Sequence, residues 1–537
     1  MEDNETDKVS NREFGELLGV ENLSGLNIEA AFDLIGKIID LSDIHGRTEG
    51  AQRALELCDE LDERTLDDGK VALLHYFRAN AWASHRKRKH NDIKAAWAWE
   101  QPEVLRELFN LRTALRHSGF KQLDKVRRCQ ILTNAANLLN TLGRCTEAIE
   151  YWNRALGIIP NFGMALGNRG YGYMSYARTL YDHGHAMVMM RFAYDDLRQA
   201  TTSSAFFEST GYDDIKEAMV READGIAAHI DLEKIAASME LENYSLGRSK
   251  GERVYRSWCL KHRLFLTPLN DLGPYPISAR DILTLPNMVV GIGEPPTLIA
   301  FFNQIKQEYV SARYLYYEGT REQKPHFADR DVLLYDTLDY PAYSLAVERV
   351  KAAYRMTYSL FDKLAFFINA YWQLGMEERS INFRSVWHTT SKKRKSRFLR
   401  DCFIGYENWL LRGLFWLSKD LLENGTDLAE TMEPDAEALN AIRNHLEHKY
   451  LKVHDWPWTS ERDTGGATPD GFRDSMAYSV TRGDIEAKAL RLLKLARSGL
   501  IYLSLAVHRE EQLRAEQRGD GLMMPLELDS WPDNWKR

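Results

Sequence analysis

Residues 435–453 have the sequence DAEALNAIRNHLEHKYLKV, and this stretch decides how the carboxy-terminal half of the chain is interpreted. Apolar residues recur at intervals of three and four, which is typical of an amphipathic helix. They form a single stripe, made of Leu439, Ile442, Leu446, Tyr450 and Val453. Aspartate is a favoured residue at a helix N-cap. The spacing therefore predicts a helix that runs from a cap at Asp435 to about Val453.

The same helix carries Arg443, Asn444 and His448, a set suited to metal-free chemistry on an RNA phosphodiester. An arginine binds phosphate oxygens through two parallel hydrogen bonds and keeps its charge. A histidine exchanges a hydroxyl or leaving-group proton near neutral pH. On an ideal helix Arg443 flanks the apolar stripe at about 60° and lies about 140° from His448. We therefore expect His448 to lie outside the core. A distortion of the helix, long side chains or a cleft that surrounds the helix must bring Arg443 and His448 together.

Four further segments of this half have helical periodicity, with no strand signal between them. They cover residues 298–317, 346–374, 399–423 and 485–514. Long helices in this arrangement predict an all-α bundle over residues 296–515. Asp362 is a polar residue within the otherwise apolar second segment, and it either supports Arg443 from below or lies on the bundle surface.

A helical bundle with Arg443, then Asn444, then His448 resembles the HEPN (higher eukaryotes and prokaryotes nucleotide-binding) ribonucleases. The resemblance implies metal-independent RNA cleavage, without a cofactor, in a cleft between two HEPN domains that each supply the arginine and the histidine. It also implies a homodimer, cyclic-phosphate ends, and roles in prokaryotic antiviral defence or toxin–antitoxin systems. Arg443 would bind the scissile phosphate, His448 would transfer the proton, and Asn444 would orient one of them or the RNA.

Other interpretations of the motif stay open at the level of sequence. In one alternative the segment is a partly exposed, basic helix end that carries out no chemistry. In another it belongs to an inactive HEPN domain that only dimerises. A zinc site from His445 and His448 lacks an evident third ligand, so no metal is expected. Glu447 is four residues after Arg443 and could pair with it. The resemblance gives no firm role to Glu447 or Tyr450, which are supporting candidates only.

The amino-terminal half contains a stretch with the spacing of a tetratricopeptide repeat, residues 129–162. Small residues at Ala136, Ala148 and Ala155 permit close contact between two helices. Gly143 occupies the turn between them, Trp152 fills the space beside them, and Pro160 ends the unit. Because such repeats bury their apolar faces only by stacking, we predict a tetratricopeptide-like helical solenoid over residues 30–205. The resemblance implies a protein or peptide partner on its concave face, or dimer assembly.

The rest of the chain is divided by changes in pattern. Residues 1–29 form an amino-terminal segment, residues 206–295 a packed connector with strand-like pieces, and residues 516–537 a tail. A basic run in the bundle half is a candidate RNA-binding patch, or else a solvated loop: Lys392, Lys393, Arg394, Lys395 and Arg397. A second basic run, residues 85–90, lies in the repeat half.

The composition of the chain limits which classes of protein it can belong to. The chain has 537 residues and a net charge of −8, which argues against a protein that coats nucleic acid with its whole surface but permits a local basic groove. Five scattered cysteines predict neither a disulfide framework nor a zinc knuckle. No apolar run reaches about 18 residues, so no membrane contact is expected. We expect a cytoplasmic protein.

Together these features predict a metal-independent endoribonuclease with a composite dimeric site, controlled by the repeat region. The alternative is a non-catalytic scaffold, in which the repeats bind a partner and the bundle mediates dimerisation. A nucleotide-transfer role is a third hypothesis, but it needs a carboxylate pair for Mg²⁺ that the sequence does not offer at a convincing spacing.

Overall fold

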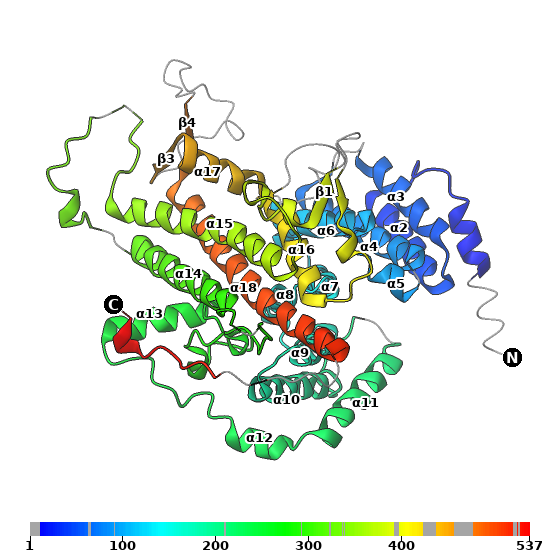
Figure 1. The fold of residues 1–537 in the computed structure, drawn as a ribbon. Coiled ribbons are helices and arrows are strands. Elements are labelled where there is room, and N and C mark those ends of the chain that lie inside the picture. Colours follow the sequence, from blue (N-terminus) through cyan, green and yellow to red (C-terminus); the bar gives the residue numbers. More distant parts are fainter. Residues whose placement is uncertain are drawn as a thin grey trace.

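The computed structural model shows a mostly helical chain (Figure 1). It describes residues 11–62, 66–90, 92–208, 211–291, 293–321, 324–335, 337, 339–390, 397–422, 436–455, 476–518, 524 and 527–536. The predicted helix cap Asp435 and the basic residues Lys392, Lys393, Arg394 and Lys395 lie outside the described residues.

The amino-terminal half is a succession of helices that pack against their neighbours in the chain. They are α2 (Ile28–His45), α3 (Thr48–Asp62), α4 (Asp68–Lys89), α5 (Ile93–Ala96), α6 (Pro102–Arg116), α7 (Lys125–Thr141), α8 (Cys145–Ile158), α9 (Gly163–Ala177) and α10 (His183–Ala200). The most extensive contacts between these helices join α4 with α6, α7 with α8, and α9 with α10. The helical character predicted for residues 30–205 is confirmed, whereas the tetratricopeptide solenoid stays a prediction.

The helix pair α7–α8 is formed by the residues that the repeat pattern singled out. Gly143 lies in the turn with a φ of 85°, a conformation that glycine adopts without strain. Ala136, Ala148 and Ala155 are fully buried, and Trp152 is 1% exposed. Small side chains at these positions let the two helices approach closely, as the sequence predicted.

The connector differs from the prediction. The described residues between 206 and 295 contain no strand and instead form the helices α11 (Asp213–His229), α12 (Leu232–Ser238) and α13 (Lys250–Lys261) and the short 3₁₀ helices η2 (Pro268–Asp271) and η3 (Pro276–Ser278). The prolines and glycines that suggested extended chain lie mainly after α13, where they begin and end the 3₁₀ turns.

In the described part of the carboxy-terminal half the chain forms five long helices, as predicted. They are α14 (Thr297–Arg321), α15 (Leu345–Tyr371), α16 (Trp409–Leu422), α17 (Ala436–His448) and α18 (Arg482–Arg518). In Figure 1, α18 lies between α14, α15 and α16, and it packs against all three.

Two pairs of short strands correct the prediction of a purely α-helical bundle. β1 (His388–Thr390) and β2 (Arg397–Leu399) are antiparallel, whereas β3 (Tyr450–His454) and β4 (Ala477–Thr481) are parallel. The predicted fourth helix therefore ends at His448 and not near Val453, and the predicted third helix begins at Trp409 and not at Leu399. In both places the apolar residues that continue the helical spacing also suit a strand.

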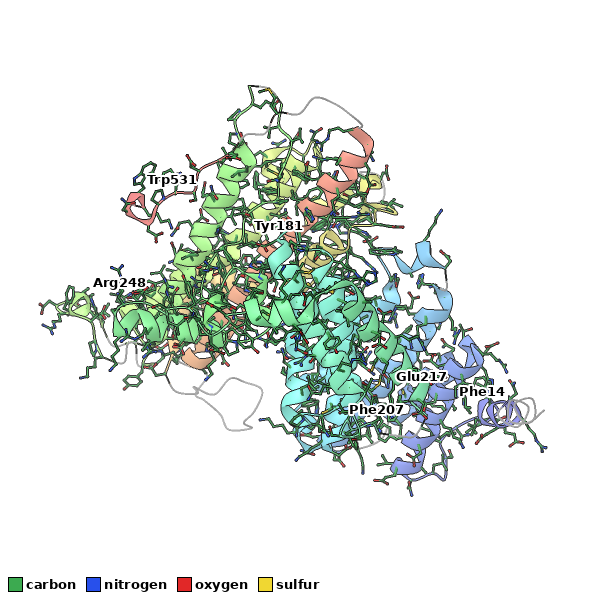
Figure 2. The ribbon with its side chains drawn as sticks, turned by 90° about the horizontal axis from the view of Figure 1, so that it is seen from below. Phe14, Tyr181, Phe207, Glu217, Arg248 and Trp531 are labelled. Carbon is green, nitrogen blue, oxygen red and sulfur yellow. The ribbon has the colours of Figure 1, made fainter. Side chains whose placement is uncertain are left out.

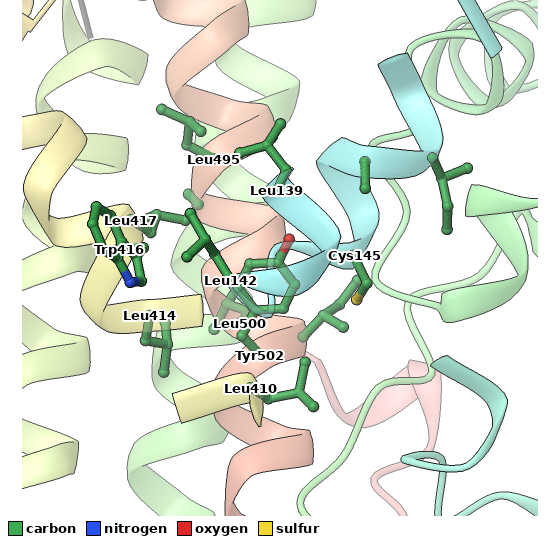
Figure 3. Packing of buried hydrophobic residues seen from close by; sticks show 14 of the residues in the cluster. Leu139, Leu142, Cys145, Leu410, Leu414, Trp416, Leu417, Leu495, Leu500 and Tyr502 are labelled. Carbon is green, nitrogen blue, oxygen red and sulfur yellow. The ribbon is translucent and has the colours of Figure 1, made fainter. Parts of the chain in front are cut away.

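One hydrophobic core runs from the amino-terminal helices through the connector into the carboxy-terminal bundle. Figure 3 shows part of it, where Leu142 after α7, Leu414 of α16 and Leu500 of α18 lie together. A smaller second core holds α2, α3 and part of α4. The two halves of the chain are thus packed together and not merely linked in sequence.

The backbones of the two halves also approach closely. A Cβ atom added to Gly143 would lie 1.9 Å from the carbonyl oxygen of Trp409, at the start of α16. Gly413, one turn further along α16, faces the backbone of Gly143 in the same way. The indole of Trp409 donates to the carbonyl of Asn140 over 2.8 Å. The turn of the predicted repeat is therefore also the docking point of α16.

A buried ionic cluster fixes the same junction. Arg112 of α6 donates two hydrogen bonds to the carboxylate of Asp420 on α16, over 2.7 and 2.8 Å. Arg144 pairs with the same carboxylate and also donates to Glu147 over 2.6 Å. The side chains of Arg112, Arg144 and Asp420 are 4%, 0% and 2% exposed. Burial alone would raise the pKa of Asp420, but the two guanidinium groups hold it below its usual range.

Tyr181, labelled in Figure 2, marks a second contact between the three regions. Its hydroxyl donates to the carbonyl of Thr284 in the connector over 2.8 Å. Its ring meets the imidazole of His508 on α18 edge to face, with ring centres 5.6 Å apart. The amino-terminal helices, the connector and the bundle therefore meet along α18.

Two expectations from composition are tested by the structure. Cys58, Cys129, Cys145 and Cys259 are buried thiols and Cys402 is an exposed one, so none of the five forms a disulfide. Within the described ranges, none of the helices combines the length and the apolar character needed to cross a bilayer.

Candidate functional site

Helix α17 carries the candidate site and is anchored by its apolar stripe. It packs against α15, α16 and the following strand β3. Leu439 and Ile442 are fully buried. The hydroxyl of Tyr354 on α15 donates to the carbonyl of Leu439 over 2.7 Å, which fixes α17 against α15. The face that bears the stripe is therefore set by packing, and the positions of the motif residues follow from it.

Arg443 lies at the edge of this packed face and is half-buried. Its guanidinium carbon lies 5.7 Å from the centre of the Tyr358 ring on α15, within the range of a cation–π contact. Its Nη1 atom donates to Oδ1 of Asn444 over 3.1 Å. The spacing allowed an ion pair between Arg443 and Glu447, but the described residues show none, and Glu447 is exposed. Arg443 and Asn444 are thus brought together, with donor groups of the guanidinium left for a ligand.

Asp362 and Tyr358 lie one turn apart on α15 and act on Arg443 from within the protein. Burial raises the pKa of Asp362, while the N–H of Phe383, which it accepts over 3.3 Å, and the charge of Arg443 oppose that rise. No ion pair joins Asp362 and Arg443, so the two side chains interact through their charges alone, and a supporting role for Asp362 stays a prediction. Burial also raises the pKa of Tyr358 to about 12. Sequence reasoning missed Tyr358, because a tyrosine in an apolar helix looks like an ordinary core residue.

His448 is the last residue of α17 and its side chain is exposed. Among the described residues, none forms a hydrogen bond or an ion pair with its imidazole. The prediction that His448 is not a core histidine is confirmed. The structure does not bring His448 into contact with Arg443 or Asn444, in line with their wide separation on an ideal helix.

His445 has a structural role that separates it from His448. Its Nδ1 atom contacts the carbonyl oxygen of Ala441 at 2.7 Å, and its ring stacks on Tyr478 of β4 at 5.1 Å between centres. It therefore packs α17 against the β3–β4 pair. Groups of three potential metal ligands are absent from the part of the chain that the structure describes. The zinc interpretation gains no support from these side chains.

Tyr450 is corrected from a helical position to the first residue of β3. Its side chain is exposed, and the ammonium group of Lys452 lies 5.4 Å from the centre of its ring. Lys452 is buried and pairs with Asp339 of the segment before α15. Helix α17 therefore ends at His448, and the chain enters β3 two residues later.

The two basic runs differ in their surroundings. Arg397, the one described member of the candidate RNA-binding patch, is exposed at the start of β2. Three cations of residues 85–90 are instead paired with carboxylates: Arg86 with Glu107 over 2.8 Å, Lys87 with Asp43 over 3.2 Å and Lys89 with Glu103 over 2.7 Å. This second run is therefore largely neutralised and does not form a free basic surface.

Comparison with known proteins identifies the carboxy-terminal region. Residues 289–510 match the sequence model that describes LA2681-like HEPN domains. The matched region contains α14 to α18 and the motif residues 443–448, and it leaves the amino-terminal helices outside. No curated protein and no solved structure matches the chain. The resemblance to HEPN proteins is thus confirmed for this domain.

Proposed function

We propose that this protein is a metal-independent endoribonuclease whose active site is completed when two HEPN domains meet. One observation carries the proposal. Helix α17 fixes Arg443 beside Tyr358 and Asn444, while His448 lies exposed at the helix end without a partner among the described residues. A proton-transfer group outside the core and away from its own arginine suits a site shared with a second copy of the domain.

The proposed reaction needs only these side chains and the RNA. The ribose 2′-oxygen attacks the adjacent phosphorus, a new P–O bond forms, and the bond to the 5′-oxygen breaks. One imidazole accepts the 2′-hydroxyl proton and an imidazolium protonates the departing 5′-oxygen. Arg443 stabilises the charge that gathers on the phosphate oxygens. The products carry a 2′,3′-cyclic phosphate and a 5′-hydroxyl group.

The remaining candidates take supporting roles in the proposal. Asn444 accepts a hydrogen bond from Arg443 and thereby orients the guanidinium. Asp362 and the ring of Tyr358 hold it at the surface of α15 through charge and contact. We assign no chemical step to Glu447 or Tyr450, whose side chains are exposed.

Binding of the RNA backbone is assigned to the basic run at Lys392, Lys393, Arg394, Lys395 and Arg397. If four of these cations contact phosphates, replacing residues 392–395 by alanine should lower the slope of log K against log salt concentration by up to about 3 for single-stranded RNA. The measurement is fluorescence anisotropy of a labelled oligonucleotide in a salt series. An unchanged slope would remove this run from the binding surface.

Control by the amino-terminal helices completes the proposal. A nuclease that acts on cellular RNA needs restraint, and this HEPN domain shares a core with the helices that precede it. A protein or peptide partner that binds the amino-terminal region can therefore act on the domain directly. We assign the protein to prokaryotic antiviral defence or a toxin–antitoxin system on the strength of this layout.

The test is cleavage of a labelled single-stranded RNA in the presence of EDTA. Wild-type protein should cleave it, and Arg443→Ala and His448→Ala should each lower the rate at least ~100-fold, the usual contribution of a proton-transfer or charge-stabilising group. Arg221→Ala and His229→Ala, two exposed residues on α11, are matched controls that should cleave like the wild type. An RNA with a 2′-deoxy residue at the cut position should resist.

Two outcomes would refute the proposed nuclease activity. Cleavage that persists in both variants, or that disappears with EDTA, removes the assigned site or the metal-free mechanism. Measurement of mass in solution tests the shared site separately, because a strict monomer that still cleaves RNA contradicts it. If the wild type neither cleaves RNA nor changes its behaviour on either substitution, the non-catalytic scaffold is the better description.

A further inference from the structure

A basic pocket lies where the amino-terminal helices, the connector and the HEPN domain meet, away from α17. Its volume is about 270 Å³. Its lining includes Glu150 and Arg154 of α8, Lys494 of α18, and Arg263 in the turn after α13. All three regions of the chain therefore contribute to a single small cavity.

Cations outnumber carboxylates around this pocket. The basic side chains are Arg154, Arg263, Arg491, Lys494 and Arg497, and the acidic ones are Glu147, Glu150 and Asp271. The carboxylates are already engaged, since Glu150 pairs with Lys494 over 2.8 Å, Asp271 with Arg497 over 2.7 Å and Glu147 with Arg144 over 2.6 Å. The pocket thus keeps a net positive charge after its internal pairs are counted.

Arg263 and Arg154 carry that uncompensated charge. Arg263 has a φ of 56°, a strained conformation for a residue with a side chain. Its Nη1 atom is buried without a hydrogen bond among the described residues. Arg154 lies at the rim, with its guanidinium carbon 5.0 Å from the centre of the Tyr151 ring. Neither arginine forms an ion pair with the described residues, and a buried donor without a partner is costly unless a ligand satisfies it.

The charges of Arg263 and Arg154 act on Glu150 inside the pocket. Burial alone would raise the pKa of Glu150, but Lys494, Arg263 and Arg154 together hold it below its usual value. Three cations therefore act on one point in the cavity wall. An anion placed there would experience the same attraction.

We propose that this pocket binds a small phosphate-bearing ligand, no larger than a mononucleotide. Guanidinium groups bind phosphate oxygens through paired, charge-assisted hydrogen bonds, which matches the unused donors of Arg263 and Arg154. Pockets for drug-sized ligands usually exceed about 300 Å³, so a volume of 270 Å³ suits a smaller molecule. The residues involved are distinct from Arg443 and His448, so the site does not depend on the proposed nuclease.

The position of the pocket gives the ligand a physical consequence. A phosphate held between α8, the turn at Arg263 and α18 would join the three regions that the core already packs together. Because a ligand that binds only the folded state raises its stability, binding should raise the melting temperature with ligand concentration. The inference is thus testable without any nuclease assay.

The experiment measures binding of pyrophosphate, AMP and adenosine to the full chain by calorimetry and by thermal melting, at constant ionic strength. Pyrophosphate or AMP should bind saturably, and adenosine, which has no phosphate, should not. Binding of pyrophosphate and AMP alike identifies the phosphate as the recognised group, and preference for AMP identifies a nucleotide. Equal binding of adenosine, or no saturable binding of either phosphate compound, would overturn the proposal.

Substitutions locate the site. Arg263→Ala and the rim variant Arg154→Gln should each weaken phosphate binding by about tenfold or more, the usual effect of losing a charge-assisted hydrogen bond. Glu150→Gln removes a competing negative charge and should strengthen binding. Arg221→Ala on α11, whose side chain is 70% exposed, is the matched control and should bind like the wild type. Wild-type affinity in both Arg154→Gln and Glu150→Gln would place the ligand elsewhere.

Discussion

The buried cluster of Arg112, Arg144 and Asp420 gives a sharp prediction about how the two halves are held together. Asp420→Asn keeps the shape of the side chain and removes its charge. Two guanidinium groups that are at most 4% exposed would then lose their common partner, and Arg144 would keep only Glu147. Removal of one member of a buried ion pair typically costs about 3–5 kcal/mol. We expect a loss of about 4 kcal/mol, a large part of the 5–15 kcal/mol that is usual for folded proteins.

The assay is equilibrium unfolding in urea, followed by tryptophan fluorescence and by far-ultraviolet circular dichroism. Trp416 lies one turn before Asp420 on α16 and is buried, so this junction contributes to the fluorescence of the 13 tryptophans of the chain. The two signals should change together, because the halves share a core. Asp213→Asn, with a side chain that is 87% exposed, is the control and should change stability by less than about 0.5 kcal/mol. A loss below about 1 kcal/mol for Asp420→Asn, or two separate transitions of which only one shifts, would refute the reasoning.

The same cluster predicts a dependence on acid. The pKa of Asp420 is lower in the folded protein than in the unfolded chain, where it is about 3.9. The stabilisation is therefore complete above that unfolded value and is lost as the pH falls towards the folded one. The wild type should lose stability below about pH 4 more steeply than Asp420→Asn. Equal slopes in urea titrations at several pH values would show that the carboxylate is not held in its charged form.

Four further substitutions, at three positions, test the site and the junction. Tyr358→Phe should leave cleavage and stability almost unchanged, because the hydroxyl is buried without a hydrogen bond among the described residues. Tyr358→Ala removes the ring under the Arg443 guanidinium and should lower the cleavage rate about tenfold. Gly143→Ala should lower the melting temperature severely, by an equivalent of more than about 3 kcal/mol, because its Cβ would lie 1.9 Å from the Trp409 carbonyl oxygen. Gly157→Ala on α8 meets nothing within 4 Å and should instead raise the melting temperature slightly. Equal melting temperatures for these two glycine variants would contradict the close approach of α16.

The sequence predicted best what depends on neighbouring residues. Apolar spacing predicts the helices α14, α15, α17 and α18, because each of them buries one apolar stripe against the others. The end of α17 could not be found in this way. Leu451 and Val453 are buried in β3, whose partner β4 follows after a separation of more than twenty residues. A parallel pairing of this kind leaves no local signal, and the apolar residues after His448 fitted a helix equally well.

The candidate site was predictable in part for the same reason. The helix placed Arg443 at the edge of the apolar stripe and His448 outside it, as periodicity alone required. The contact of Arg443 with Tyr358 depends on how α17 packs across α15, and no pattern within one helix encodes that crossing. The neutralisation of the basic run at residues 85–90 was likewise hidden, because Glu103 and Glu107 approach it from another helix.

The least predictable feature is a buried contact between the bundle and the connector. Arg497 is buried on α18, yet its carboxylate partner is Asp271 and its carbonyl acceptors are Phe265 and Thr267, all in the connector. A chain cut near residue 289 would leave this guanidinium without those partners and would expose the apolar face that α16 and α18 present to α7 and α8. These buried contacts cross the predicted boundaries at residues 205 and 295. Any control of the HEPN domain by the amino-terminal helices must then act through a continuous packed core, by shifting helices that already touch, and not by releasing a tethered domain.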